Sequence, residues 1–394
     1  MNTLGASIKK IPDDFKVEEI PLYETSGEGE HLYIYVQKTN MSHEELVRNV
    51  AKEFGVSRKA VGCAGRKDLR ATTKQMLSIH LTGQNGKIPE TIKNIKILSS
   101  SRHSNKLRLG HLSGNKFVIR IRDIDLTKKK SIKDKLLTLS KAGLPNYFGP
   151  QRFGNKGNNH ELGLAVATEN WELLMDLLLC GEEKHNKFVD ELDYKRALEC
   201  WPFGQPAERN ILESLAKGKS PEQASMAISK SQKKLWINSL QSSIFNSVLD
   251  RRIENNTWNC FVVGDLAWNF DGGGRTFEVT SEDIVCESMH SRLNNLSISP
   301  TGPIWGSKMR SPSDEVKNLE ESVINSYNLD ESNLSALSKY ASGTRRPLRV
   351  PVFNPKVESG SDENGDFIQT TFSLPAGSYA TVVISNIVSK TLNI

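Results

Sequence analysis

The order of strand-like and helix-like segments along the 394 residues constrains the fold most. Strand-like runs, several of which alternate apolar and polar residues as half-buried strands do, occur near both ends of the chain. The predicted strands are 15–20, 32–36, 75–81, 116–122, 348–353, 367–372 and 379–385. The middle of the chain instead resembles a series of helices. Because the chain is too long for one ordinary core, this pattern predicts an α/β domain that is interrupted by a mostly helical domain.

Cap and turn residues set the limits of the predicted helices. Ser42-x-x-Glu45 is a capping box, which opens a helix that ends near Gly55. A second helix, Ser131–Ala142, is stopped by Gly143. The other predicted helices are 160–181, 188–200, 206–217, 221–230, 232–254, 313–326 and 333–341. A small group of strands is expected within 258–280, and 358–366 is expected to form a solvent hairpin or loop.

Composition and short motifs exclude several classes of protein. The contents of 37% hydrophobic and 25% charged residues are typical of a soluble globular protein. No apolar run approaches the roughly 18 residues of a membrane span, and residues 1–10 lack the apolar stretch of a signal peptide, so we expect a cytoplasmic protein. The five cysteines form no Cys-x-x-Cys pair, which argues against a disulfide framework or a cysteine zinc site. P-loop and Gly-x-Ser-x-Gly motifs are also missing, and we expect no metal and no cofactor.

The net charge of +6 conceals one strongly basic block. Residues 51–150 contain 22 Lys and Arg against 6 Asp and Glu, an excess of 16 positive charges. Such an excess raises the local electrostatic potential enough to attract phosphates, so it predicts nucleic-acid binding. The alternative is that basic helices such as Lys128–Lys135 are solvated and bind no ligand.

The same block contains Gly65–Gln75, in which one carboxylate, Asp68, is surrounded by cations. Thr72 and Thr73 are poor helix formers, so a loop is expected here. The cations are Arg66, Lys67, Arg70 and Lys74. The motifs of several other catalytic classes are missing, but an ionised Asp with a cationic partner is suited to catalysis by a carboxylate. These cations are the first candidates for that partner.

A second segment, Pro145–Gly154, combines three aromatic residues with an Asn and an Arg. In a loop, this mixture offers a ring on which a base can stack and an amide that can bind its edge. The alternative is a turn whose aromatic residues fill the core. Two other segments, Leu374–Thr381 and Ile8–Phe15, are by themselves more often structural than functional.

These segments together resemble a known family. Gly65–Gln75 resembles the catalytic motif of the TruD family of RNA pseudouridine synthases, Asn146–Gly154 its second motif, and Phe372–Thr381 its C-terminal motif. Supporting matches are Pro12–Glu19, Gly27–His31, Gln241–Asn246 and Thr301–Gly302. The matches run from residue 8 to near 385 in the order of the family, so the chain is identified as a member.

The resemblance implies roles for individual residues. Asp68 aligns with the catalytic aspartate, and Lys9 aligns with the lysine that pairs with it and would favour its charged form. Phe148 aligns with the ring that stacks on the target base. The positions that contact the substrate align with Phe15, Asn146 and Tyr379. With Lys9 as the partner, the cations next to Asp68 are expected to contact backbone phosphates or to be solvated, and no individual role is assigned to Arg66, Lys67 or Arg70.

The resemblance also implies a fold and a domain division. The fold is α+β, a pseudouridine-synthase-like mixed and mostly antiparallel sheet flanked by helices, with a large, mostly helical α/β inserted domain. The catalytic domain would be discontinuous, 1–154 with 343–394, and the inserted domain would be 155–342.

The implied activity is that of a tRNA pseudouridine synthase that isomerises a uridine, typically uridine 13, on a flipped-out base. The expected partner is tRNA, with other structured RNAs as further substrates; the protein is expected to be a monomer that contacts no membrane. Two alternatives stay open: a non-catalytic RNA-binding relative or RNA chaperone, and a nuclease or phosphoryl transferase that uses Asp68 with a metal.

Overall fold

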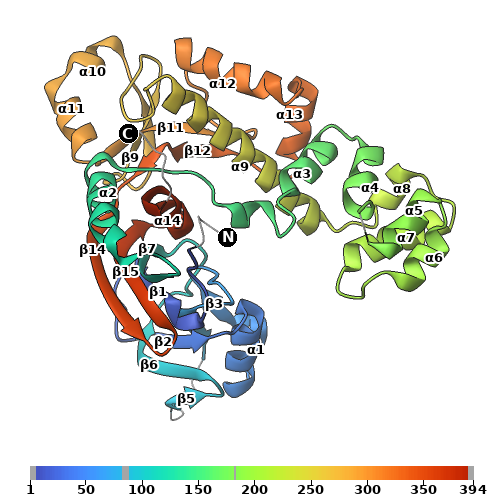
Figure 1. The fold of residues 1–394 in the computed structure, drawn as a ribbon, viewed down its shortest axis with the longest axis horizontal. Helices are drawn as coiled ribbons and strands as arrows, with labels where there is room; N and C mark the ends of the chain where they lie inside the picture. Colours follow the sequence, from blue (N-terminus) through green and yellow to red (C-terminus); the bar gives the residue numbers. More distant parts are fainter. Residues whose placement is uncertain (1–5, 82–87, 182, 389–394) are drawn as a thin grey trace. The chain divides into compact units, whose positions relative to one another are not determined.

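The computed structural model describes residues 6–81, 88–181 and 183–388 (Figure 1). Its contacts divide the chain into two compact units. The first unit comprises 1–144 and 350–394, and the second comprises 145–349. Short strands β8 (Leu144–Pro145) and β13 (Arg349–Val350) pair where the chain passes between the units. The assignment of a catalytic domain and an inserted domain stays a prediction.

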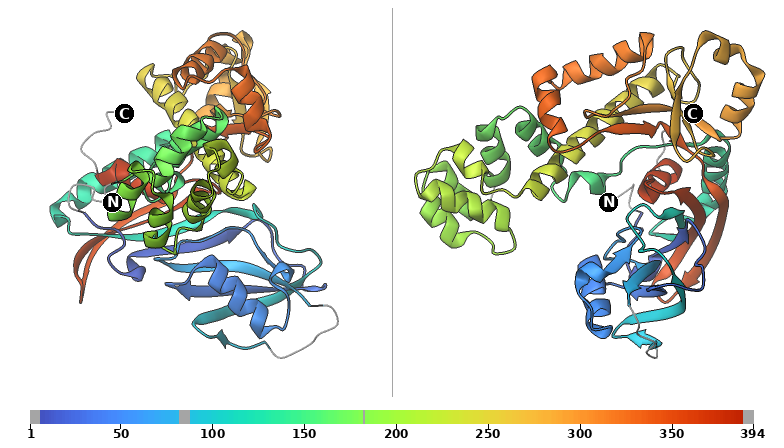
Figure 2. Two further views of the ribbon diagram at one scale, coloured as in Figure 1. Left: turned by 90° about the vertical axis from the view of Figure 1, so that its right-hand side faces the viewer. Right: turned by 180° about the vertical axis from the view of Figure 1, so that it is seen from behind.

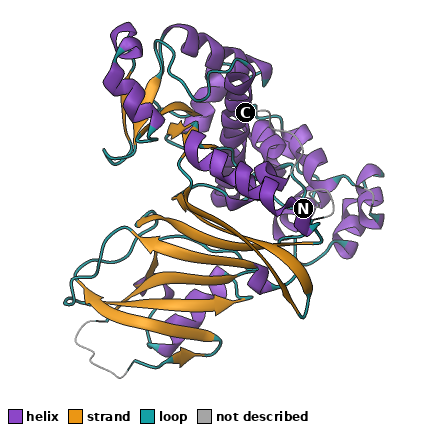
Figure 3. Ribbon diagram, turned by 60° about the vertical axis from the view of Figure 1, so that its left-hand side comes forward, coloured by secondary structure: helices purple, strands orange, loops and turns teal. Residues whose placement is uncertain are grey.

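A nine-stranded sheet forms the first unit (Figure 3). The strand order is β14-β15-β7-β1-β4-β2-β6-β5, and β3 pairs with β4. The strands are β1 (Phe15–Pro21), β2 (His31–Thr39), β3 (Val61–Cys63), β4 (Thr72–His80), β5 (Thr91–Ile92), β6 (Ile95–His103), β7 (Leu112–Arg122), β14 (Phe353–Asp362) and β15 (Gly365–Pro375). In the part of this sheet that the structure describes, β1 and β4 are parallel and the other pairs are antiparallel. The predicted mixed, mostly antiparallel sheet is confirmed.

Helix α1 (His43–Glu53) covers the part of the sheet that contains β2 and β4. Its buried residues Leu46 and Val50 pack against Ile34 and Val36 of β2 in one apolar cluster. The predicted start of this helix is correct, because the Ser42 hydroxyl accepts a hydrogen bond from the Glu45 amide at 3.1 Å. At the other end of the sheet, α2 (Lys129–Ala142) packs against both β14 and α14 (Ala380–Val388).

Helix α14 contradicts the predicted strand at 379–385. The run is rich in Val and Ile, which favour strands. The buried residues Ala380, Val383, Ile384 and Ile387 nevertheless follow helical spacing, and they form the face that the helix buries. The prediction was wrong because packing on the rest of the unit outweighs the local preference of β-branched residues.

The segment 358–366 is a hairpin between β14 and β15, one of the two predicted forms, and ion pairs anchor it. Asp362 ends β14, and its carboxylate accepts from Arg120 at 2.9 Å and from Arg122 at 2.7 and 2.8 Å. Arg122 is 1% exposed and also donates to the buried Asp14 at 2.7 Å. These contacts join the hairpin to β7 and to the segment that leads into β1.

The second unit begins with a largely helical part (Figures 1 and 2). Helix α9 runs through the unit, with α4–α8 gathered towards one end and α10 and α11 towards the other. The helices are α3 (Asn159–Ala167), α4 (Trp171–Leu179), α5 (Lys184–Asp190), α6 (Tyr194–Cys200), α7 (Pro206–Ala216), α8 (Pro221–Ser225), α9 (Lys230–Glu254), α10 (Ser281–Val285), α11 (Glu287–Asn294), α12 (Asp314–Ser326) and α13 (Glu331–Ser338).

Two of the predicted helices are each divided by a residue with a positive φ. The predicted helix 160–181 is two helices, α3 and α4, separated at Glu169, whose φ is 53°. The predicted helix 188–200 is likewise divided between α5 and α6 at Leu192, with a φ of 59°. A non-glycine residue in the left-handed region ends a helix, and nothing in the apolar spacing marks these positions.

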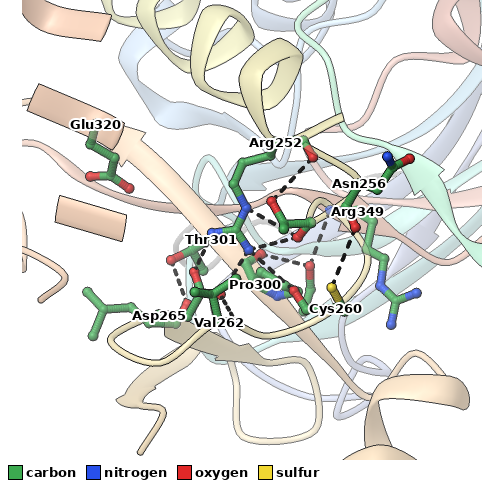
Figure 4. Close-up of polar contacts among 12 residues, drawn as sticks. Arg252, Asn256, Cys260, Val262, Asp265, Pro300, Thr301, Glu320 and Arg349 are labelled. Carbon is green, nitrogen blue, oxygen red and sulfur yellow. Dashed lines mark hydrogen bonds and ion pairs between the residues drawn. The ribbon is translucent and has the colours of Figure 1, made fainter. Parts of the chain in front are cut away.

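A four-stranded sheet, β10-β9-β11-β12, completes the second unit. Its strands are β9 (Leu266–Asn269), β10 (Arg275–Glu278), β11 (Ile298–Ile304) and β12 (Thr344–Pro347). Buried ion pairs support it: Arg252 binds Asp265 through two hydrogen bonds of 2.9 Å, and Arg345 binds Glu320 at 2.6 and 2.8 Å. Figure 4 shows Arg252 and Asp265 among the backbone groups that complete this polar core.

Candidate active site

Sheet topology brings together Lys9 and Asp68, which lie far apart in the sequence. Asp68 lies in the loop between β3 and β4, and Lys9 precedes β1. Because β1 and β4 are parallel neighbours, with Lys16 opposite Thr72, the segments that lead into them converge at one edge of the sheet. Lys9 Nζ lies 2.6 Å from Asp68 Oδ2.

The Lys9–Asp68 pair is accessible to solvent, and an aromatic ring packs against Lys9. The Asp68 side chain is 40% exposed and that of Lys9 is 25% exposed. The Lys9 ammonium lies 4.1 Å from the centre of the Phe15 ring, a cation–π contact. Phe15 itself is 3% exposed and makes an edge contact with Phe117. Phe15 therefore positions Lys9 in this structure, and its predicted contact with substrate stays a prediction.

The loop that carries Asp68 is braced by a buried ion pair. Lys67 Nζ lies 3.0 Å from Glu19 Oε2, and it also donates a hydrogen bond to Asn115 Oδ1. The Lys67 side chain is 6% exposed and that of Glu19 is 1% exposed. The expectation that Lys67 contacts phosphate or is solvated was wrong, because its carboxylate partner comes from a distant strand. At the end of the loop, the Ala71 carbonyl accepts from the Asn40 amide at 3.3 Å.

The other cations near Asp68 in the sequence face solvent to different extents. Arg66 and Arg70 are exposed, and Arg66 lies 4.0 Å from Glu44. Lys74, on β4, is 39% exposed and lies 3.9 Å from Glu18. These three side chains fit the expectation of solvated or phosphate-contacting groups.

Sequence reasoning missed Lys38, which forms a hydrogen bond to the backbone of the loop that carries Asp68. Its Nζ donates to the backbone carbonyl of Asp68 at 3.0 Å and to that of Met41 at 2.5 Å. The signal was present: Lys38 continues the alternate positions of β2 that bury Ile34 and Val36, where an apolar residue is expected.

Tyr379 belongs to the same unit as Asp68. It is partly buried and immediately precedes α14, after the turn that follows β15. The end of β15 lies near the braced loop, because Leu374 pairs with Asn115, the residue that binds Lys67. The role of Tyr379 as a substrate contact stays a prediction.

The remaining predicted site residues, Asn146 and Phe148, lie in the second unit. Asn146 is 3% exposed, and its amide donates to the Pro347 carbonyl at 2.9 Å and accepts from Arg346 at 2.6 Å. In this structure its amide therefore holds Arg346. Contact between Asn146 and substrate stays a prediction.

Phe148 is held by its backbone and by cations. Asn246 accepts from the Phe148 amide at 2.9 Å and donates to its carbonyl at 3.1 Å. The guanidinium carbon of Arg346 lies 4.1 Å from the centre of the Phe148 ring, and that of Arg152 lies 5.1 Å away. Arg346 is a second residue that sequence reasoning missed, since it lies about two hundred positions from the motif that it supports.

The described residues contain neither a candidate metal site nor a helix that could span a membrane. Within 6–81, 88–181 and 183–388, no group of three or more His, Cys, Asp or Glu side chains could hold a metal ion. Over the same described residues, no helix combines the length and apolarity that crossing a membrane requires.

Comparisons with known proteins agree over nearly the whole chain. The family model of "tRNA pseudouridine synthase D (TruD)" matches residues 1–387. A tRNA pseudouridine synthase D of Syntrophotalea carbinolica is 36% identical over 396 residues, which cover 98% of this chain and 96% of that protein. One of Geobacter sulfurreducens is 36% identical over 400 residues, covering 98% and 94%.

A solved structure gives the same answer. A crystal structure from Methanosarcina mazei, assigned to tRNA pseudouridine synthase D, has a TM-score of 0.79 and 29% sequence identity, and the match covers 98% of this chain and 94% of that one. The α+β fold and the family resemblance of the motifs are therefore confirmed. The chain belongs to the tRNA pseudouridine synthase D (TruD) family of isomerases.

Proposed function

We propose that this chain converts a uridine of tRNA, typically uridine 13, to pseudouridine, with Asp68 as the catalytic carboxylate. The observation that carries the proposal is the ion pair of 2.6 Å between Lys9 and Asp68, on a braced and accessible loop of a chain that belongs to this family. The reaction breaks the N1–C1′ bond, turns the base and joins C5 to C1′. It needs no redox step and no activated donor.

Asp68 suits a step that needs one charged carboxylate. Lys9 supplies the positive charge that pairs with the carboxylate, and the braced backbone keeps the carboxylate in place without reorganisation during the reaction. Three routes stay open for Asp68: attack on C1′, attack on C6, and removal of the C2′ proton. In each route the base must leave its stack, at a cost of a few kcal/mol.

The other predicted contact residues, Asn146 and Phe148, belong to the second unit. We propose that the Phe148 ring stacks on the target base, with Asn146 nearby, and that Phe15 and Tyr379 contribute contacts from the first unit. Arg152 and Arg346, which hold the Phe148 ring, would keep it oriented for stacking. We further propose that the protein acts as a cytoplasmic monomer.

Tritium release from tRNA labelled at C5 of uridine tests the catalytic role of Asp68. We expect Asp68→Asn to lower the release rate by about a thousandfold or more, the scale of losing a catalytic group, while tRNA affinity stays within a few-fold. The matched control is Asp123→Asn, which removes a carboxylate from the exposed ion pair with Lys10 and should retain activity. Full activity of Asp68→Asn would refute the assignment.

The same assay separates the alternatives. A tRNA with cytidine in place of uridine 13 should release no tritium, and continued release would place the target elsewhere. Wild-type protein that binds tRNA but releases no tritium would support a non-catalytic RNA-binding protein. Cleavage of the RNA that stops on addition of a chelator would support the metal-dependent nuclease.

A further inference from the structure

Lys38 is a buried cation in a position that the sheet otherwise reserves for apolar residues. It follows Ile34 and Val36 at alternate positions of β2, and both of these are 0% exposed. Lys38 itself is 1% exposed. In the described part of the chain Lys38 makes no ion pair within 4.0 Å, so no carboxylate at contact distance offsets the cost of burying its charge. A buried charge without a close counter-ion is costly to keep, which points to a use for it.

The contacts of Lys38 join two turns. Its Nζ donates to the Met41 carbonyl in the turn before α1 and to the Asp68 carbonyl in the loop before β4. The distances are 2.5 and 3.0 Å. A carbonyl oxygen fixed in this way holds the peptide unit that follows Asp68, so the backbone that carries the carboxylate cannot move away without breaking this partly buried hydrogen bond.

Three charged groups, two from the β3–β4 loop and one from α1, act on the Lys38 ammonium. Burial lowers its pKa below the ordinary 10.5, and the positive charge of Lys67 acts in the same direction. The negative charges of Asp68 and, on α1, Glu45 favour the ammonium, but they do not cancel the effect of burial. Lys38 in turn helps to lower the pKa of His43, for which burial is the main cause.

We propose that Lys38 is a positioning residue for the reaction of Asp68. Its ammonium fixes the backbone of Asp68, whereas Lys9 binds the carboxylate, and it adds a second positive charge near that carboxylate. The effect on the rate rests on the proposed function, whereas the effect on the loop does not.

Two variants separate the hydrogen bond from the charge. Lys38→Met removes both, whereas Lys38→Gln keeps an N–H donor without the charge. Hydrogen exchange of peptides that cover 64–71 measures the loop without any substrate. We expect faster exchange in Lys38→Met than in wild type, and recovery of much of the protection in Lys38→Gln. If Lys38→Met does not fold, Lys38→Gln alone is compared with wild type in the rate measurement below.

Single-turnover tritium release from bound tRNA measures the effect on the reaction. We expect both variants to be slower than wild type by about 10- to 100-fold, with tRNA affinity within threefold, because the loss concerns the step after binding. The control is Lys217→Met, which removes an exposed lysine of the second unit that pairs with Glu213, and it should change neither exchange nor rate.

The pH dependence gives a readout that a merely structural role would not change. Since burial lowers the pKa of Lys38 below 10.5, its charge is lost at a lower pH than that of an ordinary lysine as the pH rises. The ratio of the wild-type rate to the Lys38→Met rate should therefore shrink as the pH rises towards 10.5, the ordinary pKa of a lysine. Ionisable groups that lie far from Lys38 are shared by the two proteins and cancel in this ratio.

The outcomes distinguish this inference from the proposed function. Unchanged exchange of 64–71 in Lys38→Met would overturn the positioning role, whether or not the wild type is active. Wild-type protein that releases no tritium would refute the proposed function and leave the exchange experiment to decide on Lys38. Equal rates for wild type and both variants, or a rate ratio that does not vary with pH, would refute the electrostatic contribution.

Discussion

At the scale of single residues, the cations near Asp68 have different structural roles although they look alike in the sequence. Lys67 is buried against Glu19, Arg66 and Arg70 are exposed, and Lys9, which binds Asp68, is distant in the sequence. The residue pattern indicated that Asp68 needs a cationic partner but not which one. Family resemblance named Lys9. The local pattern could not name it, because Lys9 comes close to Asp68 only through the pairing of β1 with β4.

The Lys67–Glu19 pair leads to a prediction about stability. Lys67→Met should destabilise the first unit by about 3–5 kcal/mol, because it leaves the Glu19 carboxylate buried without a counter-ion. Chemical denaturation followed by far-ultraviolet circular dichroism measures the change. All six tryptophans lie in the second unit, so tryptophan fluorescence serves as an internal control that should shift less.

A surface pair provides the matched comparison. Lys187→Met removes a lysine that is 76% exposed and 3.8 Å from Glu191, and it should change the free energy of unfolding by less than about 0.5 kcal/mol. A similarly small effect of Lys67→Met would mean that the buried pair does not brace the loop.

At the scale of elements, the hairpin of β14 and β15 is anchored through one carboxylate. Hydrogen bonds from Arg122 lower the pKa of Asp362 from 3.8 to about 2. Because the pKa is lower in the folded protein, the stabilisation is complete above pH 3.8 and is lost as the pH falls towards 2. Asp362→Asn should therefore lower the thermal unfolding midpoint near neutral pH, and the difference from wild type should shrink in acid.

Thermal scans of both proteins from about pH 7 down to pH 3 check this prediction. The control is Glu191→Gln, which removes one carboxylate from an exposed pair and should leave the midpoint nearly unchanged. A difference between Asp362→Asn and wild type that is constant with pH would show that the carboxylate charge is not what anchors the hairpin.

The elements differ in how far the sequence could predict them. Strands β1 and β2 and helix α1 were predictable, since the local pattern and the burial agree. Strand β11 was missed because Pro300 and Pro303 argue against a strand, yet it lies between β9 and β12. Helix α14 was misassigned because its β-branched residues favour a strand, and only its packing against α2 decides the outcome.

At the scale of the whole molecule, the separation into two units was visible as a change from alternating to helical patterns. Function was not visible in this way. The basic block indicated a polyanionic partner, and the motifs shared with a family indicated that this partner is RNA. The residues that structure added, Lys38 and Arg346, act by holding other site residues. Such support comes from distant parts of the chain, so a local pattern does not identify it.

The salt dependence of tRNA binding tests whether the basic block contacts the RNA. If about 5–8 phosphates are neutralised, the logarithm of the affinity should fall with the logarithm of salt concentration with a slope of several units. Lys128, Lys130 and Lys133 are exposed in and before α2, and their simultaneous change to Gln should reduce the slope by about one unit for each phosphate contact that is lost. Three exposed lysines of the second unit, Lys195, Lys217 and Lys219, provide the matched control. An unchanged slope for the first triple variant would identify α2 as a solvated helix, and a flat response of the wild type would mean that the whole block faces away from the RNA.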